Sequence, residues 1–100
     1  MTYLICYDIS EDKIRTRLAK RLERAGCVRL QKSIFVAPDF DARRLSMLRG
    51  ALLKMLPPQL GYGESLLMIP IERDNLTSIT LLGDTAQTEA LLKKVLFTIM

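Results

Sequence analysis

A short apolar run followed at once by an amphipathic segment constrains the fold of this chain more than any other feature. Residues 3–9 are apolar, β-branched or aromatic apart from Asp8, which is the pattern of a buried strand. Ser10 then offers a hydroxyl that can cap a helix, and apolar residues recur at intervals of four and three up to Ala25. The change from a continuous apolar run to a helical spacing of apolar residues predicts a strand that ends near Asp8 and leads directly into a helix.

The middle of the chain continues this alternation. Short strands are predicted at residues 28–31 and 33–37 with a tight connection around Lys32, although one bent strand fits the same pattern. Asp41 can cap a second amphipathic helix, which must end at the two prolines at 57–58 because proline cannot continue a helix.

The C-terminal part supplies the elements that decide the fold class. Residues 65–71 and 77–82 have strand-like patterns, and residues 85–97 carry a weak helical one. The order strand, helix, strand, strand, helix, strand predicts an α+β fold of the ferredoxin-like split βαβ type, an antiparallel sheet with two helices on one face. The strand at 77–82 is additional, and it must pair with an open sheet edge of its own chain or of a partner, which predicts a homodimer. We expect one ferredoxin-like domain over residues 1–83 and a tail over residues 84–100.

Composition excludes several classes of protein. A chain of 100 residues with 49% hydrophobic and 26% charged residues is one packed domain. It shows neither a charged leader before an apolar run nor an apolar stretch of about 20 residues, so we expect a cytoplasmic protein without a membrane partner. Cys6 and Cys27 lack the spacing of a zinc site and are predicted to be ordinary buried thiols.

Basic residues gather in one stretch of the chain. The net charge is only +4. Within residues 13–32, however, these basic residues are opposed only by Glu23: Lys13, Arg15, Arg17, Lys20, Arg21, Arg24, Arg29 and Lys32. Such a cluster fits a polyanion, and all of its members except Arg24 are assigned to nucleic-acid binding. The alternative is a solvated helix face that keeps the protein in solution.

The chemistry that this chain can perform is limited by its residue types. It has no histidine and no glycine-rich phosphate loop, which excludes imidazole triads and common nucleotide sites. Asp8 remains, at the end of an apolar strand, where a charge is costly unless it is exposed, paired or bound to a cation. Two copies of Asp8 at a two-fold interface could hold Mg²⁺, or Mn²⁺, and generate the nucleophile for phosphodiester hydrolysis. Alternatively, Asp8 is a helix-entry carboxylate bonded to backbone amides, as Glu11 and Asp12 are predicted to be partners of the helix dipole.

A set of short motifs resembles one known family over residues 1–83. They comprise Tyr7–Lys13, Arg15, Arg17, Leu18, Arg29–Phe35, Ile69–Ile71 and Ile79–Gly83. On these motifs the chain resembles the CRISPR-associated protein two family. It departs from the family pattern at Val36, where a glutamate is usual, and at Ile14, where a basic residue is frequent.

The resemblance implies a ferredoxin-like homodimer whose last strand crosses to the partner sheet, with Asp8 of both chains at a magnesium site. It further implies that residues tied to metal-dependent nuclease activity lie at the following positions: Tyr7, Asp8, Arg15, Arg17, Arg29 and Phe35. From the residues alone, Arg15 and Arg17 either clamp phosphate or are solvated, and Phe35 is either a core residue or a base-stacking platform.

Two functions follow from this reading. The first is a CRISPR-associated, Mg²⁺-dependent endonuclease that acts on RNA or double-stranded DNA in spacer acquisition. The second, also implied by the resemblance, is a dimeric scaffold that grips DNA by its backbone and bridges the CRISPR integrase subunits without performing chemistry. A third reading, a ferredoxin-like interaction module or a toxin-type nuclease relative, rests on the fold alone.

Overall fold

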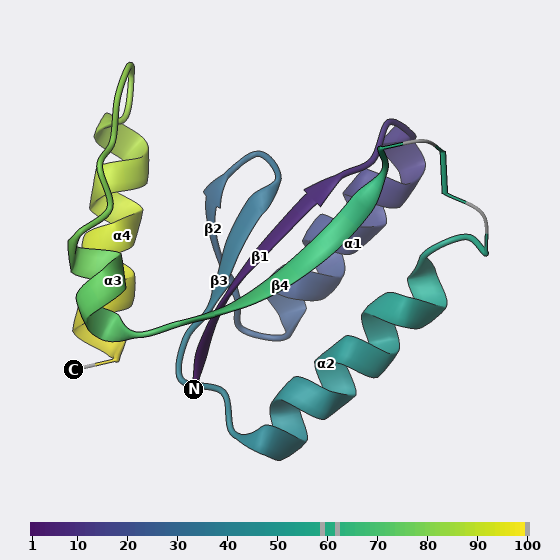
Figure 1. The fold of residues 1–100 in the computed structure, drawn as a ribbon, viewed down its shortest axis with the longest axis horizontal. Helices are drawn as coiled ribbons and strands as arrows, with labels where there is room; N and C mark the ends of the chain where they lie inside the picture. The colour runs from purple at the N-terminus through teal and green to yellow at the C-terminus, as the bar shows by residue number, and fades with distance from the viewer. Residues whose placement is uncertain (59, 62, 100) are drawn as a thin grey trace.

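Strand β1, Thr2–Asp8, forms where the apolar run predicts a buried strand, and it is one of the two inner strands of the sheet. The computed structural model describes residues 1–58, 60–61 and 63–99. β1 pairs antiparallel with β3, Ile34–Ala37, on one side and with β4, Ser65–Ile71, on the other. β2, Val28–Gln31, completes a four-stranded sheet in the order β2-β3-β1-β4 (Figure 1). The predicted antiparallel split βαβ sheet is confirmed.

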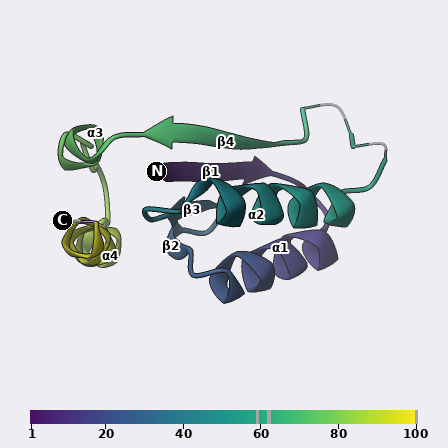
Figure 2. The same cartoon turned by 90° about the horizontal axis from the view of Figure 1, so that it is seen from below.

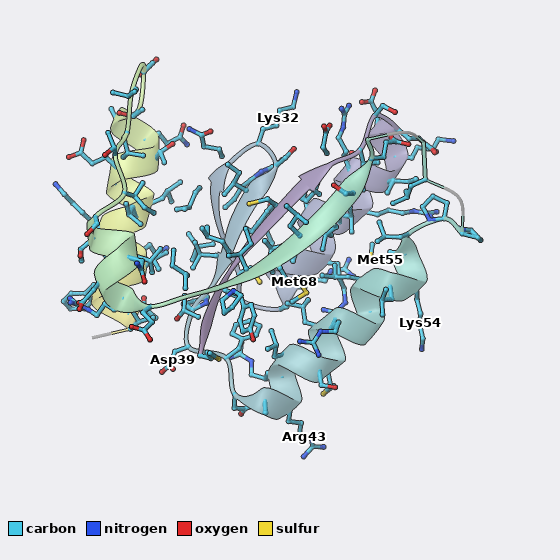
Figure 3. The ribbon with its side chains drawn as sticks, viewed as in Figure 1. Lys32, Asp39, Arg43, Lys54, Met55 and Met68 are labelled. Atoms are coloured by element: carbon cyan, nitrogen blue, oxygen red, sulfur yellow. The ribbon has the colours of Figure 1, made fainter. Side chains whose placement is uncertain are left out.

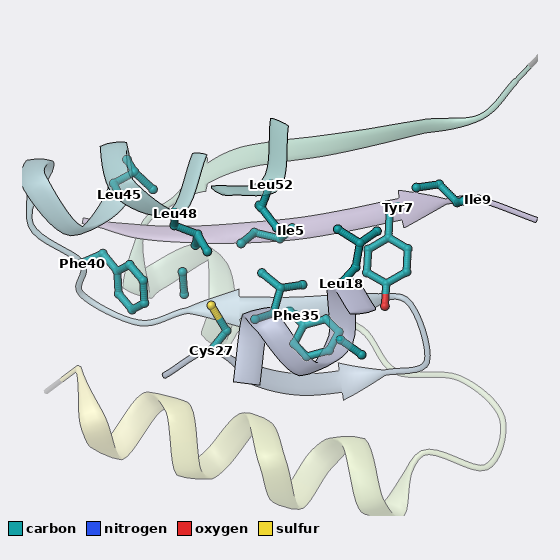
Figure 4. Close-up of a cluster of buried hydrophobic side chains, with 13 residues drawn as sticks. Ile5, Tyr7, Ile9, Leu18, Cys27, Phe35, Phe40, Leu45, Leu48 and Leu52 are labelled. Carbon is teal, nitrogen blue, oxygen red and sulfur yellow. The ribbon is translucent and has the colours of Figure 1, made fainter. Parts of the chain in front are cut away.

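Two helices cover one face of this sheet. They are α1, Asp12–Arg24, and α2, Ala42–Met55, and Figure 2 shows them running along the sheet next to each other. Side chains of β1 that alternate inward, Ile5 and Tyr7, pack with Leu18 and Leu48 in a cluster from which water is almost excluded (Figure 4). This cluster is the main core, and it fixes the direction in which every β1 side chain points.

A second, smaller cluster lies on the opposite face of β2 and β3. It forms around Leu30 and Val36, which meet Leu92 and Val95 of α4, Ala86–Thr98. The weak helical pattern at residues 85–97 is therefore a helix that packs on β2, and the buried Thr88 hydroxyl donates a hydrogen bond to the Leu30 carbonyl at 3.0 Å. A short helix, α3, Arg73–Thr77, lies beside α4 (Figure 1).

The prediction of an additional strand at residues 77–82 is wrong. Thr77 ends α3, and the hydroxyls of Thr77 and Ser78 donate to the Asp74 carbonyl at 2.7 and 3.0 Å. Short polar side chains that bond to nearby backbone compete with extended structure. The segment from Ile79 to Leu82 forms no strand, and Leu82 is 84% exposed.

The two predicted helix caps differ in outcome. The Asp41 side chain accepts a hydrogen bond from the Arg44 amide at 2.8 Å, so that the predicted cap of α2 is confirmed. Ser10 does not cap α1, whose N-cap residue is Glu11, because the Ser10 hydroxyl is bonded to Glu64 instead. None of the helices formed by the described residues has the length and apolar character that crossing a bilayer requires.

Candidate functional site

Asp8 is the last residue of β1, and its side chain is exposed. Its neighbours Tyr7 and Ile9 point into the main core, so Asp8 points to the other face of the sheet. There it lies in a groove of about 330 Å³ that is also lined by Cys6, Ser33, Ser65 and Leu67. Ser65 is the direct partner of Asp8 in the register between β1 and β4.

The surroundings of Asp8 bear on its two predicted roles. The helix that follows is capped at Glu11 and not at Asp8, which removes support for the helix-entry alternative. Within the described ranges, no group of three or more His, Cys, Asp or Glu side chains that could hold a metal ion is present. Asp8 is the single carboxylate among the residues that line its groove, so Mg²⁺ would need further oxygen ligands from outside that set.

The predicted basic surface contains a groove of about 440 Å³ between α1 and the connection from β2 to β3. Arg15, Lys20, Arg29 and Lys32 line it together with the acidic side chains of Asp12 and Glu23. Lys32 stands at the tip of the connection and points away from the sheet (Figure 3). Four of the seven residues assigned to nucleic-acid binding are thus brought together.

Arg29 holds this connection in place. Its Nε and Nη2 atoms both donate to the Lys32 carbonyl, at 3.2 and 2.6 Å. The guanidinium carbon lies 5.4 Å from the centre of the Phe35 ring, and Phe35 stacks on Tyr7 with ring centres 6.3 Å apart. Arg29 also pairs with Glu23 at 3.9 Å. The Phe35 ring beneath the guanidinium thus helps to fix the Arg29 side chain at the edge of the groove.

Tyr7 and Phe35 lie beneath the surface. Phe35 has no exposed area and Tyr7 is 6% exposed, and Figure 4 shows both rings within the main core. The phenol of Tyr7 donates a long hydrogen bond, 3.5 Å, to the Lys32 carbonyl. Burial raises the pKa of Tyr7, while the charges of Arg29 and Arg15 partly oppose that shift. The phenol therefore stays protonated at neutral pH, and the Phe35 ring, which stacks on Tyr7, supports Arg29 from below.

The remaining basic residues are spread around α1. Arg15 forms an ion pair with Asp12 one turn before it. Lys13 and Arg17 are exposed and lie outside the lining of the groove, while Arg21 is half-buried and its charge acts on the Cys27 thiol. The basic residues of this stretch therefore form two sets: those that line the groove, and solvated side chains such as Lys13 and Arg17 beside it.

The two grooves lie on opposite faces of the sheet and meet at the tip of the β2–β3 connection. Ser33 lines both of them, and its carbonyl accepts a hydrogen bond from the Tyr7 amide at 3.1 Å. Sequence reasoning missed Ser33 and Ser65 as neighbours of Asp8. Only the strand register, which the sequence pattern does not specify to the residue, could have identified them.

An apolar strip continues from Asp8 along β1 and β4. Leu67 and Ile69 are 53% and 43% exposed, and they pair with Cys6 and Leu4 across the strands. Because residues directly opposite in antiparallel strands share a face, the strip lies on the same face as Asp8. α4 packs on the β2 side of the sheet and leaves these β4 side chains uncovered.

Comparisons with known proteins agree with this geometry. The family model described as CRISPR associated protein Cas2 matches residues 1–79. A protein of Synechocystis sp. named CRISPR-associated endoribonuclease Cas2 2 is 33% identical over 81 residues, which is 81% of this chain and 83% of that protein. Among solved structures, Cas2 of Streptococcus pyogenes superposes with a TM-score of 0.69 at 17% identity, covering 83% of this chain and 100% of that one. A hypothetical protein of Thermus thermophilus superposes with a TM-score of 0.57 at 30% identity, over 71% and 80% of the two chains.

Proposed function

Because the chain belongs to the CRISPR-associated protein Cas2 family, we propose that it is a metal-dependent endonuclease that hydrolyses phosphodiester bonds during spacer acquisition. The observation that carries this proposal is the exposed Asp8 at the end of β1, in a groove that shares Ser33 with the cation-lined groove. RNA is the first substrate to test, because the Synechocystis relative is named an endoribonuclease, and double-stranded DNA is the second.

The active form in this proposal is a homodimer. The apolar strip with Leu67 and Ile69 offers a surface that a second copy can bury, and exposed apolar patches of this kind mark interfaces. The strip adjoins Asp8, so a two-fold axis near the end of β1 would place both Asp8 carboxylates close together. The proposed metal site therefore requires the proposed homodimer.

Asp8 of each protomer would hold the metal, Mg²⁺ or Mn²⁺. Carboxylate oxygens are the ligands that these hard cations prefer, and such sites leave positions for water and for phosphate oxygens. When bound, the metal would lower the pKa of a water molecule and offset the charge of the phosphodiester. The chain itself contributes the position of the two carboxylates.

The basic groove would bind the phosphate backbone. Arg29 is fixed by the Lys32 carbonyl and by the Phe35 ring, so it loses little side-chain entropy on binding. Arg15, Lys20 and Lys32 line the same groove and would add positive charge for the phosphates, whose contacts carry no sequence information. Binding should thus be salt-dependent and largely independent of sequence.

A scaffold role is the second candidate, and one observation favours it. The groove cations and Asp8 lie on opposite faces of the sheet, so binding of a duplex backbone does not require Asp8. In this role the dimer would grip DNA and bridge subunits of the CRISPR integrase, while the partner performs the chemistry.

The deciding experiment is cleavage of labelled RNA and duplex DNA by the wild-type protein and by Asp8→Ala, with Mg²⁺, with Mn²⁺ and with a chelator. Asp84→Ala is the matched control, because Asp84 is an exposed carboxylate near the C-terminal part of the chain. The nuclease proposal expects metal-dependent cleavage that Asp8→Ala abolishes, while nucleic-acid binding and the Asp84→Ala activity stay at the wild-type level.

The opposite outcome is equally clear. If neither the wild-type protein nor Asp8→Ala cleaves, and both bind duplex DNA as dimers, the hydrolytic role fails and the scaffold stands. Light scattering after size-exclusion chromatography measures the dimer directly, and Leu67→Glu in the apolar strip should shift it to monomer.

A further inference from the structure

Glu64 lies immediately before β4 and binds a distant part of the chain. Its Oε2 atom accepts hydrogen bonds from the Ser10 amide and from the Ser10 hydroxyl, both at 2.7 Å. Its Oε1 atom accepts a third, from the Gly61 amide at 2.6 Å. One carboxylate thus joins the segment after β1 to the segment before β4, across 54 positions of sequence.

These contacts fix the backbone next to Asp8. The pairing of β1 with β3 ends at Cys6, whereas the pairing with β4 continues to Asp8 and Ser65. Ser10 is two positions beyond Asp8, and Ile9 between them is 2% exposed. The backbone that bears Asp8 is therefore held by the core at Ile9, by the strand pair at Ser65 and by Glu64 at Ser10.

The strength of the Glu64 contacts follows from charge. Hydrogen bonds to an ionised carboxylate are shorter and stronger than neutral ones. The bonds from Ser10, and then the bond from Gly61, lower the pKa of Glu64 from its ordinary value of 4.5, so the carboxylate is ionised at neutral pH. A side chain at position 61 would also interfere, because a Cβ atom there would lie 2.6 Å from Oε1.

We propose that Glu64 is the positioning residue of the Asp8 site, because its three hydrogen bonds fix Ser10 and with it the end of β1 from which the Asp8 carboxylate extends. The inference rests on the proposed function of Asp8. In this role Glu64 acts through Ser10 and Gly61 and contacts neither the metal nor the substrate.

The test compares Glu64→Gln with Glu72→Gln in the full chain. Both changes remove one negative charge next to β4, but Glu72 follows the strand and makes no side-chain cap with α3. Amide hydrogen exchange of Ser10, followed by NMR, reports whether the hydrogen bonds from Ser10 to Glu64 are intact. Calorimetric titration with Mn²⁺ measures the affinity of the proposed metal site. Ser10→Ala removes one of the three hydrogen bonds, and Ser10→Thr restores a hydroxyl, so this pair covers the case in which Glu64→Gln does not fold.

The expected result is faster exchange at Ser10 and a Mn²⁺ affinity about tenfold weaker in Glu64→Gln, the low end for loss of a group that orients a ligand. Ser10→Ala should weaken the affinity by less, Ser10→Thr should restore it, and Glu72→Gln should leave both measurements at the wild-type values. Faster exchange at Ser10 with unchanged Mn²⁺ affinity would overturn the positioning role alone. If Asp8→Ala binds Mn²⁺ as tightly as the wild type, both the metal assignment and this inference fall.

Discussion

Replacing Phe35 with leucine separates a packing role of this side chain from a direct role in chemistry. Phe35 has no exposed surface, stacks on Tyr7 and lies beneath the guanidinium of Arg29. Leucine keeps an apolar side chain in the site and removes only the ring. We therefore expect Phe35→Leu to destabilise the fold and to loosen Arg29, without removing any contact between Phe35 itself and a substrate.

The magnitude follows from the interactions that the ring makes. A stacked aromatic pair contributes about 1 kcal/mol beyond its buried area, and a half-exposed cation above a ring contributes about 0.5 kcal/mol. The change of shape in a closely packed core adds a further cost, which brings the loss of unfolding free energy to about 2 kcal/mol. For a domain of this size, this corresponds to a fall in Tm of about 10 °C.

Thermal unfolding followed by circular dichroism measures this fall. Phe97→Leu is the matched control, because Phe97 is 76% exposed and should leave Tm unchanged. A double-mutant cycle with Arg29→Met should give a coupling free energy of about 0.5 kcal/mol between the ring and the guanidinium. The reasoning is refuted if Phe35→Leu melts within about 3 °C of the wild type, or if the two changes add without coupling.

Three further predictions concern caps and titratable groups. Asp41→Ala removes the hydrogen bond to the Arg44 amide and should lower the free energy of unfolding by about 1 kcal/mol in chemical denaturation, whereas Asp41→Ser should not. Burial, opposed only in part by the charges of nearby arginines, raises the pKa of Cys27 to about 11, and burial also raises the pKa of Cys6. Because Cys6 is half-buried and Cys27 is buried, iodoacetamide at neutral pH should modify Cys6 first, as peptide mass spectrometry of the native protein can show. Because the folded pKa of Glu64 lies below its ordinary value of 4.5, its stabilising contribution is complete above that pH and is lost as the pH falls through the folded value. The protection factor of the Ser10 amide, which corrects for the pH dependence of intrinsic exchange, should therefore fall only below pH 4.5, and an unchanged protection factor in strong acid would contradict the charged hydrogen bonds of Glu64.

The parts of the fold that the sequence predicts are those decided by local periodicity. The apolar run that becomes β1 and the stripe that becomes α1 need no knowledge of distant residues, because period alone distinguishes a strand from a helix. The cap at Asp41 is equally local. Together with the strand-like runs that become β2, β3 and β4, these elements give the order of the split βαβ sheet, and so the fold class was predictable.

The wrong predictions share one physical cause, competition from other hydrogen-bonding partners. Ser10 has the right residue type and position for a helix cap, but Glu64, 54 positions later, takes its hydroxyl. Residues 77–82 have strand-like composition, but Thr77 and Ser78 satisfy the Asp74 carbonyl and close a helical turn instead. A single sequence without the strand register cannot rank such partners.

The candidate site was predictable as a set of residue types but not as an arrangement. Asp8 at the end of a strand and basic residues on a helix follow from pattern. The burial of Phe35 beneath Arg29, and the separation of Lys13 and Arg17 from the groove, depend on how α1 sits on the sheet. Charge clusters in sequence therefore overestimate the number of cations that meet at one place.

The placement of the two grooves has a consequence for the kind of substrate. Within one protomer, the route from Arg29 and Lys32 to Asp8 through Ser33, which lines both grooves, passes over the tip of the β2–β3 connection, since the grooves lie on opposite faces of the sheet. Duplex DNA resists such a bend, because its persistence length is about 150 base pairs. A single strand bends freely at this scale. If one protomer supplies both the cations and the carboxylate, flexible single-stranded RNA should therefore be cleaved in preference to duplex DNA, whereas duplex DNA should bind across the cations without reaching Asp8.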